Sequence, residues 1–318
     1  LKSMILITGG FGRVGYNLVD ALLKKKFFVR VFEKKAVAAR QRKNLEIFYG
    51  DIAKKEDCER AMKSIHIVYH LAAIVDYLAP KKLVYDVNVN GTRNIVEAAK
   101  KVGAKIIYLS STAVMGKKLP HLPANEKTGC RPTAYYGQTK LEAEKIVREA
   151  GGISIRSVDI MGPRFEEVYH AMVEKISEGK MQIIGDGQNL IQYIHISDLI
   201  QALMLAKDKG KSGEVYIVAG SEAKTQEQCW EMIAKYLKVP APSKKISVEL
   251  ARFVAKVNVV KARLKRKKPS FIPAYVDKIV ANREFDISKA REELGFEPKV
   301  SSEEMARELV EEWNKKKK

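Results

Sequence analysis

Two adjacent tyrosines and a lysine stand together in the stretch "PTAYYGQTK", residues 132–140. Tyr136 precedes Lys140 by four positions, whereas Tyr135 precedes it by five. Side chains four residues apart share one face of an α-helix, and side chains five apart do not. A helix at this place would therefore let Tyr136 and Lys140, but not Tyr135, act on one substrate atom.

The chemistry open to this pair is proton transfer. A phenol with a pKa of about 10 is a poor base at neutral pH. A nearby ammonium group stabilises the phenolate and lowers that pKa, so we expect Lys140 to turn Tyr136 into an acid–base group. The alternative is a surface helix that carries a tyrosine and a lysine incidentally, and the pair alone does not exclude it.

The elements that must position this pair are alternating strands and helices. Helix formers fill 134–149, which ends at Gly151-Gly152, and helical patterns also cover about 55–64 and 81–101. Short apolar runs predict strands at 4–8, 28–33, 45–51, 66–72, 105–111 and 153–158. Repeated β-α units of this length predict an α/β fold with a Rossmann-type, doubly wound parallel sheet.

The regular alternation loosens after about residue 160, and the last eighty residues read as mostly helical. A chain of 318 residues has room for one large α/β domain and a smaller one. We expect a dinucleotide-binding domain at 1–160, with sheet elements returning at about 190–220. An interleaved, smaller, mostly helical substrate-binding part would cover 161–318.

The net charge of +20 is unusual for a globular chain. It fits either a lysine-rich solvated surface or an anionic partner. We find no recognition-helix motif, zinc finger or basic groove interleaved with aromatic residues, so we expect no nucleic-acid partner. No apolar run is long enough to span a bilayer, and the first residues do not resemble a signal peptide.

The three cysteines are odd in number and far apart, at Cys58, Cys130 and Cys229. This spacing fits a reducing compartment rather than a disulfide framework, and it lacks the close pairs of a zinc site. We therefore expect a cytoplasmic protein without a metal site.

A glycine cluster, "TGGFGRVG" at 8–15, follows a predicted strand and opens a predicted helix. Two frames fit it, Gly10-x-Gly12-x-x-Gly15 and Gly9-x-x-Gly12-x-x-Gly15. Glycines let the backbone approach a pyrophosphate at a helix N-terminus, where unpaired N–H groups point outward. A plain tight turn is the alternative, but the strand–glycine–helix context favours dinucleotide binding. The expected cofactor contacts here are Gly9, Phe11, Gly12, Arg13, Val14 and Gly15.

Glu33 ends the second predicted strand, eighteen residues after Gly15. A carboxylate at this place accepts hydrogen bonds from the adenosine ribose and repels a 2′-phosphate, which favours NAD. Arg13, Lys34 and Lys35 are cations that would pair with such a phosphate. NADP therefore stays open as an alternative cofactor.

Several further motifs, in a characteristic order, resemble those of the extended short-chain dehydrogenase/reductases of the NAD-dependent epimerase/dehydratase superfamily. Besides the glycine loop they are "GDI" (50–52), "HLAA" (70–73), "NVNGT" (88–92), "LSSTAVMG" (109–116), "YGQTK" (136–140), "RSVDIMGPR" (156–164) and "IHISDL" (194–199). The segment "FDISKAREELGFEPKVS" (285–301) extends the resemblance to the C-terminal region. Together these motifs are specific, although each alone is modest.

The resemblance implies roles for residues that spacing alone does not single out. Asn88 would brace the strand beside the active site. Contacts to the adenine and along the cofactor would come from Asp51 and Ile52, and from Leu71, Ala72 and Ala73.

The resemblance also implies a catalytic set of Ser111, Tyr136 and Lys140. Hydride transfer at C4 of nicotinamide would be coupled to proton transfer between Tyr136 and the substrate oxygen. Lys140 would in addition hold the nicotinamide ribose, and Ser111 would orient the substrate oxygen. Ser110 and Thr112 are the other candidates for the serine position.

Two positions differ from the pattern of the nucleotide-sugar enzymes, and these differences narrow the class of substrate. Thr112-Ala113 stand where dehydratases carry an acidic pair, and Ile191 stands where an arginine would bind a diphosphate. Arg164, Lys180 or the basic C-terminal part would have to replace that arginine. The chain resembles more the 3β-hydroxysteroid dehydrogenase and dihydroflavonol reductase branch, which acts on ring alcohols and ketones of apolar molecules.

We carry three functions forward. The first is an NAD(P)-dependent dehydrogenase or ketoreductase acting on a hydrophobic cyclic or isoprenoid-like small molecule. The second is a nucleotide-sugar 4-epimerase with tightly bound NAD, and the third is a dinucleotide-sensing scaffold on the same fold. We interpret His70 and His195 as packing or hydrogen-bonding residues, and we expect a homodimer formed through the helices at about 81–101 and 134–149.

An amphipathic, basic segment covers 248–268. Its apolar residues recur at helical spacing, at Leu250, Phe253, Val254, Val257, Val260 and Leu264. We favour a helix packed on the body with a solvated basic end. The alternative is a helix that lies on a membrane surface and recruits the enzyme to a lipidic substrate.

Overall fold

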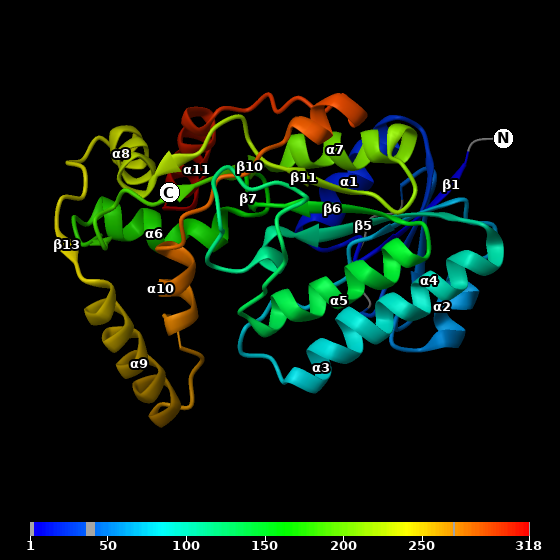
Figure 1. The fold of residues 1–318 in the computed structure, drawn as a ribbon, viewed down its shortest axis with the longest axis horizontal. Helices are drawn as coiled ribbons and strands as arrows, with labels where there is room; N and C mark the ends of the chain where they lie inside the picture. The colour runs from blue at the N-terminus through cyan, green and yellow to red at the C-terminus, as the bar shows by residue number, and fades with distance from the viewer. Residues whose placement is uncertain (1–2, 36–41, 270, 318) are drawn as a thin grey trace.

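The computed structural model describes residues 3–35, 42–269 and 271–317. Seven parallel strands form its main sheet, in the order β11-β6-β5-β4-β1-β2-β3 (Figure 1). The strands are β1 (Met4–Thr8), β2 (Phe28–Glu33), β3 (Leu45–Tyr49), β4 (Ile67–His70), β5 (Lys105–Ser111), β6 (Ile153–Ser157) and β11 (Val215–Val218). This order is that of a doubly wound sheet, so the predicted Rossmann-type α/β fold is confirmed.

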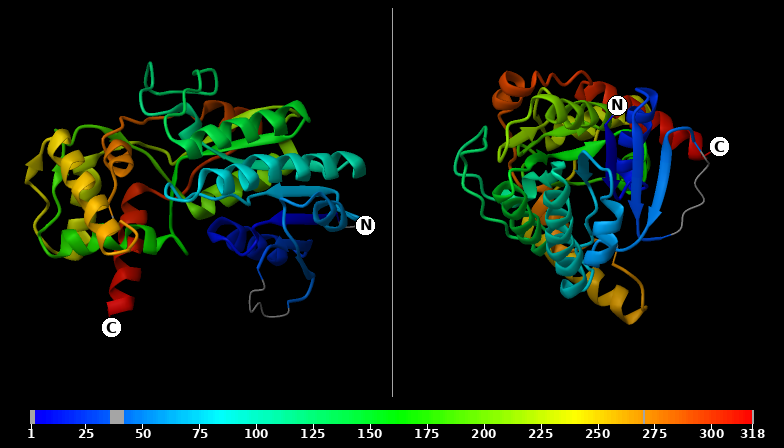
Figure 2. Two further views of the ribbon diagram at one scale, coloured as in Figure 1. Left: turned by 90° about the horizontal axis from the view of Figure 1, so that it is seen from below. Right: turned by 90° about the vertical axis from the view of Figure 1, so that its right-hand side faces the viewer.

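Helices cover both faces of this sheet (Figure 2). On one face lie α1 (Arg13–Lys24) and α7 (Ile196–Lys209), and on the other lie α2 (Lys55–Ala61), α4 (Gly91–Val102) and α5 (Tyr135–Glu149). The apolar strand β1 shows why the sheet needs both layers. Ile5 and Ile7 are buried in one core cluster and Leu6 in the other, because successive side chains of a strand point to opposite faces.

The predicted helix at 81–101 has a break in its helical geometry. It consists of α3 (Lys81–Tyr85), a π-helical turn η1 (Asp86–Asn90) and α4. Single π-helical turns often mark functional sites, and this one carries Asn88. Two predicted strands also end early, at Tyr49 and at His70, so Asp51 and the "LAA" segment at 71–73 lie in loops rather than in strands.

A second group of helices packs beside the sheet, on the left in Figure 1. The helices α6 (Glu166–Ser177), α8 (Gln226–Leu237) and α11 (Ser302–Lys317) share one core cluster that contains Trp230 and Trp313. Short pieces complete the chain: η2 (Thr112–Met115), β7 (Asp159–Met161), β8 (Ile183–Ile184), β9 (Leu190–Ile191), β10 (Tyr193–His195), β12 (Lys224–Thr225), β13 (Lys245–Ile246) and η3 (Ala290–Leu294). Through β11 the chain returns from this region to the main sheet.

The helices α9 (Val248–Leu264) and α10 (Pro273–Ile279) pack against each other in a small cluster of their own. Within α9 only Ala251 and Ala255 are buried. The apolar stripe predicted for this helix does not supply its packing, because Phe253 is 63% and Leu264 80% exposed. The helix thus packs on α10 through its two small alanines, and most of the apolar stripe that the sequence indicates is exposed.

Candidate active site

The predicted site residues follow strand ends that meet at one edge of the sheet. The strands β1, β4, β5 and β6 end side by side, at Thr8, His70, Ser111 and Ser157. Ligands of open parallel sheets bind outside the carboxyl ends, at the point where the strand order reverses. In this sheet that point lies between β1 and β4.

The glycine loop joins β1 to α1 in a shape that needs its glycines. Gly9 has a φ of +67°, and a Cβ added to Gly15 would lie 2.2 Å from the Gly9 carbonyl oxygen. Gly12 is the N-cap of α1, which has neither a side-chain cap bond nor an acidic residue in its first turn. The helix N-terminus therefore keeps N–H groups for an anion, which fits the pyrophosphate of a dinucleotide.

The carboxylate of Glu33 lies against this loop, because the Phe11 N–H donates to its Oε2 over 3.2 Å. The Lys34 ammonium pairs with Asp51 over 2.6 Å, and the Arg13 guanidinium lies 6.0 Å from the centre of the Phe165 ring. Two of the cations that would favour a 2′-phosphate thus have other contacts. The arrangement fits the unphosphorylated ribose of NAD.

His70 supports the loop that follows β4. Its Nδ1 lies 2.7 Å from Thr8 Oγ1, and its Nε2 lies 2.9 Å from Thr92 Oγ1. Thr8 Oγ1 in turn accepts the N–H groups of Leu71 and Ala72, at 3.2 and 3.1 Å. Burial lowers the pKa of His70 to about 3, so its ring is neutral at physiological pH and serves as a hydrogen-bonding residue.

Asn88 holds the chain on both sides of the site. Its amide accepts the Ile74 N–H over 2.8 Å and donates to the Ile74 carbonyl over 3.1 Å. It also donates to Thr139 Oγ1, whose hydroxyl donates to the Tyr136 carbonyl over 2.9 Å. The π-helical turn that carries Asn88 therefore couples the loop after β4 to the first turn of α5.

Lys140 is buried beneath the sheet edge, with 2% of its surface exposed. Its ammonium donates to the Leu109 carbonyl over 2.5 Å and lies 4.0 Å from the centre of the Tyr108 ring. Burial lowers the pKa of Lys140 to about 7, and the nearby Glu144 carboxylate opposes that shift. Glu144 itself forms a buried ion pair with Arg156 at 2.6 Å.

Tyr136 lies on the same helix and is half-buried. Burial raises the pKa of its phenol above the ordinary value, and a hydrogen bond with Ser111 opposes this shift. The expectation that Lys140 lowers the pKa of Tyr136 is not met by the protein groups alone. The ammonium of Lys140 is directed to the Leu109 carbonyl, so desolvation is the larger influence on the phenol.

The three candidates for the serine position have different surroundings. Ser110 is buried and donates to Glu144 over 2.6 Å, and Thr112 is buried and donates to the Ser157 carbonyl over 3.4 Å. Ser111 is half-buried at the end of β5 and is the member of this trio that bonds with Tyr136. This placement supports Ser111, and its catalytic role stays a prediction.

Four residues near the site were not expected to contribute to it. The Tyr77 ring lies 6.4 Å from the Tyr136 ring and 6.0 Å from the Tyr275 ring, measured between ring centres. Lys278 and Asp159 form an ion pair of 2.6 Å, and the Asp159 charge also raises the pKa of Tyr136. Tyr77 lies in a loop and Tyr275 and Lys278 lie on α10, so only the folded chain brings them to α5.

A cavity beside this site is lined by both apolar and charged side chains. Ile191, at the position where an arginine was missing, lines it together with Arg283, whose Nε is buried and has no hydrogen-bond partner among the described residues. The other two replacements considered have different contacts. The Arg164 guanidinium lies 3.9 Å from the centre of the Tyr16 ring, and Lys180 pairs with Glu178 over 3.0 Å.

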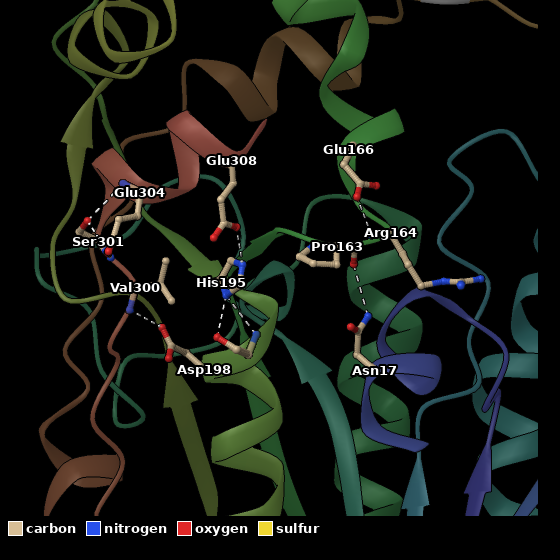
Figure 3. A network of polar contacts seen from close by, with 11 residues as sticks. Asn17, Pro163, Arg164, Glu166, His195, Asp198, Val300, Ser301, Glu304 and Glu308 are labelled. Carbon is tan, nitrogen blue, oxygen red and sulfur yellow. Dashed lines mark hydrogen bonds and ion pairs between the residues drawn. The ribbon is translucent and has the colours of Figure 1, made fainter. Parts of the chain in front are cut away.

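His195 links the C-terminal helix to the start of α7 (Figure 3). Its Nδ1 lies 2.7 Å from Ser197 Oγ, and its Nε2 lies 3.1 Å from Glu308 Oε2. Close by, Asp198 accepts the Val300 N–H over 3.1 Å. His195 thus has a hydrogen-bonding role between elements, in agreement with the interpretation of its motif.

The described residues contain no group of three or more histidine, cysteine or acidic side chains that could hold a metal ion. All three cysteines are free thiols. Within the same part of the chain, no helix combines the length and the apolar character needed to cross a bilayer.

The fold and its glycine loop define a dinucleotide-dependent enzyme. The family model described as "NAD dependent epimerase/dehydratase family" matches residues 5–219. The chain therefore belongs to the NAD-dependent epimerase/dehydratase family, as an extended short-chain dehydrogenase/reductase whose cofactor is NAD. It is an oxidoreductase of the dehydrogenase type.

Two relatives illustrate the similarity along the chain. The mouse (Mus musculus) "Sterol-4-alpha-carboxylate 3-dehydrogenase, decarboxylating" is 26% identical over 96% of this chain and 89% of its own length. The "3 beta-hydroxysteroid dehydrogenase/Delta 5-->4-isomerase" of Mycobacterium tuberculosis is 25% identical over the same 96% and 89%. These identities leave the substrate of this chain open.

Solved structures show the same fold. A UDP-glucose 4-epimerase from Thermotoga maritima superposes with a TM-score of 0.79 at 24% identity, over 99% of this chain and 100% of that one. A dTDP-glucose 4,6-dehydratase from Bacillus anthracis, solved with NAD, gives a TM-score of 0.77 at 23% identity, over 99% and 97%.

Proposed function

We propose that this enzyme transfers a hydride between NAD and a secondary alcohol or ketone on a hydrophobic cyclic or isoprenoid-like molecule. The observation that carries the proposal is the grouping of Ser111, Tyr136 and Lys140 at the end of β5 and the start of α5, with Ser111 hydrogen-bonded to Tyr136. The steroid dehydrogenases among the relatives, which match nearly the full chain, support the apolar substrate class.

In this mechanism bound NAD supplies the hydride-accepting or hydride-donating carbon, C4 of nicotinamide. Tyr136 exchanges a proton with the substrate oxygen, and Ser111 hydrogen-bonds that oxygen and orients it. Lys140, whose ammonium donates to the Leu109 carbonyl, would hold the nicotinamide ribose. Because burial keeps the Tyr136 phenol protonated, the protein groups favour proton donation to a ketone oxygen.

The cofactor contacts belong to the same proposal. The loop at 9–15 would bind the pyrophosphate, and Glu33 would bind the adenosine ribose. Asp51 and Ile52 would flank the adenine, and 71–73 would line the rest of the cofactor. Asn88 is a positioning residue, because its contacts are with Ile74 and Thr139.

Replacing Tyr136→Phe tests the mechanism. We expect turnover to fall by about 10²–10⁴-fold, the usual contribution of a positioned acid or base, while NAD binding is retained. Tyr135→Phe is the matched control, because Tyr135 is five positions from Lys140. Its ring faces the Lys81 ammonium, which lies 5.3 Å from the ring centre. Steady-state kinetics with ring alcohols and ketones and titration with NAD give the two readouts. Undiminished turnover in Tyr136→Phe would refute the assignment.

A second function is favoured by one observation. Arg283 brings a guanidinium into the cavity where Ile191 replaces the expected arginine, and a guanidinium can bind a diphosphate. This fits a nucleotide-sugar 4-epimerase, which must retain its NAD through the catalytic cycle. Mass spectrometry of the nucleotide released on denaturation separates the two. Near-stoichiometric NAD that survives gel filtration favours the epimerase, whereas reversible binding of added NAD favours the dehydrogenase.

We also propose that the enzyme is a cytoplasmic homodimer. The pairing surface would be formed by α4 and α5, which lie side by side over the sheet. The mass in solution, measured by light scattering, tests this pairing. A monomer at micromolar concentration would contradict it.

A further inference from the structure

Large hydrophobic side chains are exposed along α9. Of the thirteen that are exposed among the described residues, five lie on this helix: Leu250, Phe253, Val254, Val260 and Leu264. At 3.6 residues per turn they share one face, while the buried Ala251 and Ala255 lie on another. A contiguous exposed apolar face of this kind marks an interaction site rather than an ordinary surface.

A second exposed apolar group lies in the segment 75–83, between β4 and the end of α3. It consists of Val75, Leu78 and Leu83, of which Val75 is 59% exposed. The two groups are joined where Lys268, just after α9, pairs with Asp76 over 3.0 Å. Both α9 and α3 lie at the lower edge of the molecule in Figure 1, and the right-hand view of Figure 2 again places them on one side.

Cations surround this apolar face. Arg252 pairs with Asp277 over 2.8 Å, and Lys268 pairs with Asp76. Within the described chain, no carboxylate pairs with the other cations of this region, which are Lys256, Lys261, Arg263 and 265–267. Glu249 is the one acidic residue of α9. The surface therefore combines apolar side chains with uncompensated positive charge.

We propose that α9 and the segment 75–83, together called the docking surface, bind to the face of an anionic lipid bilayer. A bilayer offers acyl chains to the exposed apolar side chains and lipid phosphates to the neighbouring cations. A nucleic acid would match the cations but leave the apolar face in water. An apolar protein partner would match the face but leave the cations unpaired.

The position of the docking surface gives this binding a purpose. Tyr77 belongs to the segment 75–83, and its ring lies 6.4 Å from the ring of Tyr136. The other neighbour of Tyr77 is Tyr275 of α10, the helix on which α9 packs. The docking surface thus adjoins the site, so docking would bring Tyr136 close to an apolar substrate dissolved in the lipid. This purpose rests on the proposed function, whereas the docking itself does not.

Co-sedimentation of the full chain with vesicles tests the docking. The probes are vesicles of phosphatidylglycerol mixed with phosphatidylcholine, and vesicles of phosphatidylcholine alone. We expect binding to the anionic vesicles at low salt, and weaker binding at an ionic strength of about 0.5 M, where surface charges are screened. The variant Phe253→Ser/Val260→Ser/Leu264→Ser should bind at least about tenfold more weakly, because it loses three inserted side chains.

The matched control is Phe28→Ser/Val168→Ser, which removes two exposed apolar side chains outside the docking surface and outside the helices α4 and α5. It should bind vesicles like the natural chain. Failure of the natural chain to bind anionic vesicles at low salt would overturn the proposal. So would a concentration-dependent dimer that the triple variant abolishes, because the apolar face would then be a contact between two copies.

Activity separates this proposal from the proposed function. The natural chain, the triple variant and the double control variant should oxidise a water-soluble ring alcohol at equal rates, because the substituted side chains lie outside the active site. Only the triple variant should lose at least about tenfold in kcat/KM for a sterol presented in anionic vesicles. Vesicle binding without turnover of either substrate would sink the proposed function and leave the docking intact.

Discussion

At the scale of single residues, burial sets the chemistry of the site more than neighbouring charge does. Lys140 and Tyr136 both lose water at the sheet edge, so the pKa of Lys140 falls to about 7 and that of Tyr136 rises. Burial thereby keeps the Tyr136 phenol protonated and brings the pKa of Lys140 close to neutral pH. Ionisable groups with pKa values shifted by burial are typical of active sites, and a buried charge lowers the free energy of unfolding.

The variant Lys140→Met measures that cost. Lysine has a pKa of about 10.4 in the unfolded chain, so the unfolded state binds more protons than the folded state between about pH 7 and pH 10. Stability of the natural chain therefore rises with pH across that window. We expect the variant to be inactive, yet to melt at a higher temperature at about pH 6 by several degrees.

The melting difference should shrink as the pH approaches about 10, because the natural chain no longer holds a buried charge there. Lys145→Met, at an exposed position of the same helix, is the control and should show no pH-dependent difference. Thermal melts of the cofactor-free proteins across this pH range are the measurement. A gap that stays constant with pH would contradict burial as the cause of the shift.

A second single residue, Glu33, is expected to select NAD over NADP. The variant Glu33→Gln keeps an acceptor for the Phe11 N–H but removes the charge that repels a 2′-phosphate. We expect the ratio of kcat/KM for NADP to that for NAD to rise about ten- to hundredfold. Glu46→Gln, on the neighbouring strand β3, is the control. An unchanged ratio would show that the cofactor is selected elsewhere.

At the scale of elements, the glycine loop and α1 fit closely enough to leave no room for a side chain at Gly15. Replacing a helical glycine by alanine usually stabilises a helix by about 1 kcal/mol. At Gly15 the new Cβ would meet the Gly9 carbonyl oxygen at 2.2 Å, so the loop must open. We expect Gly15→Ala to lower the melting temperature and to weaken NAD binding at least about tenfold.

Calorimetric titration with NAD measures this effect. Gly129→Ala is the control, because an added Cβ there meets nothing within 4 Å. It should leave NAD affinity unchanged. An affinity of Gly15→Ala equal to that of the natural chain would contradict the role of the loop.

At the scale of the whole molecule, we propose a division into 1–160, with sheet elements returning at about 190–220, and a smaller part within 161–318. The chain has two tryptophans, Trp230 and Trp313, and both lie in the core cluster of α6, α8 and α11. Tryptophan fluorescence therefore reports the smaller part, whereas circular dichroism reports all helices and strands.

We expect urea unfolding to give different midpoints by these two probes, because separate cores need not unfold together. NAD should raise the midpoint seen by circular dichroism more than the one seen by fluorescence, since the cofactor stabilises the part that binds it. Coincident transitions with and without NAD would mean that the chain unfolds as one unit and would contradict the division.

The sequence by itself determined those features that depend on local periodicity. Runs of apolar residues predict the strands of the sheet. An offset of four residues selects Tyr136 over Tyr135, because the spacing of side chains on a helix does not depend on the rest of the chain. The glycine cluster predicts its own loop for the same reason, since Gly9 and Gly15 act within one turn. Family motifs then supplied the candidates for the remaining positions.

Only the tertiary structure decided the features that depend on burial and on distant partners. Ser111 rather than Ser110 bonds with Tyr136, because packing on α5 determines which face of β5 meets the site. Tyr77 and Tyr275 are close only once α10 packs near the loop after β4. The apolar stripe of α9 has a clear helical period, yet its direction depends on which side the neighbouring helix covers. A periodic pattern identifies the faces of an element, and only the partners of that element decide which face is buried.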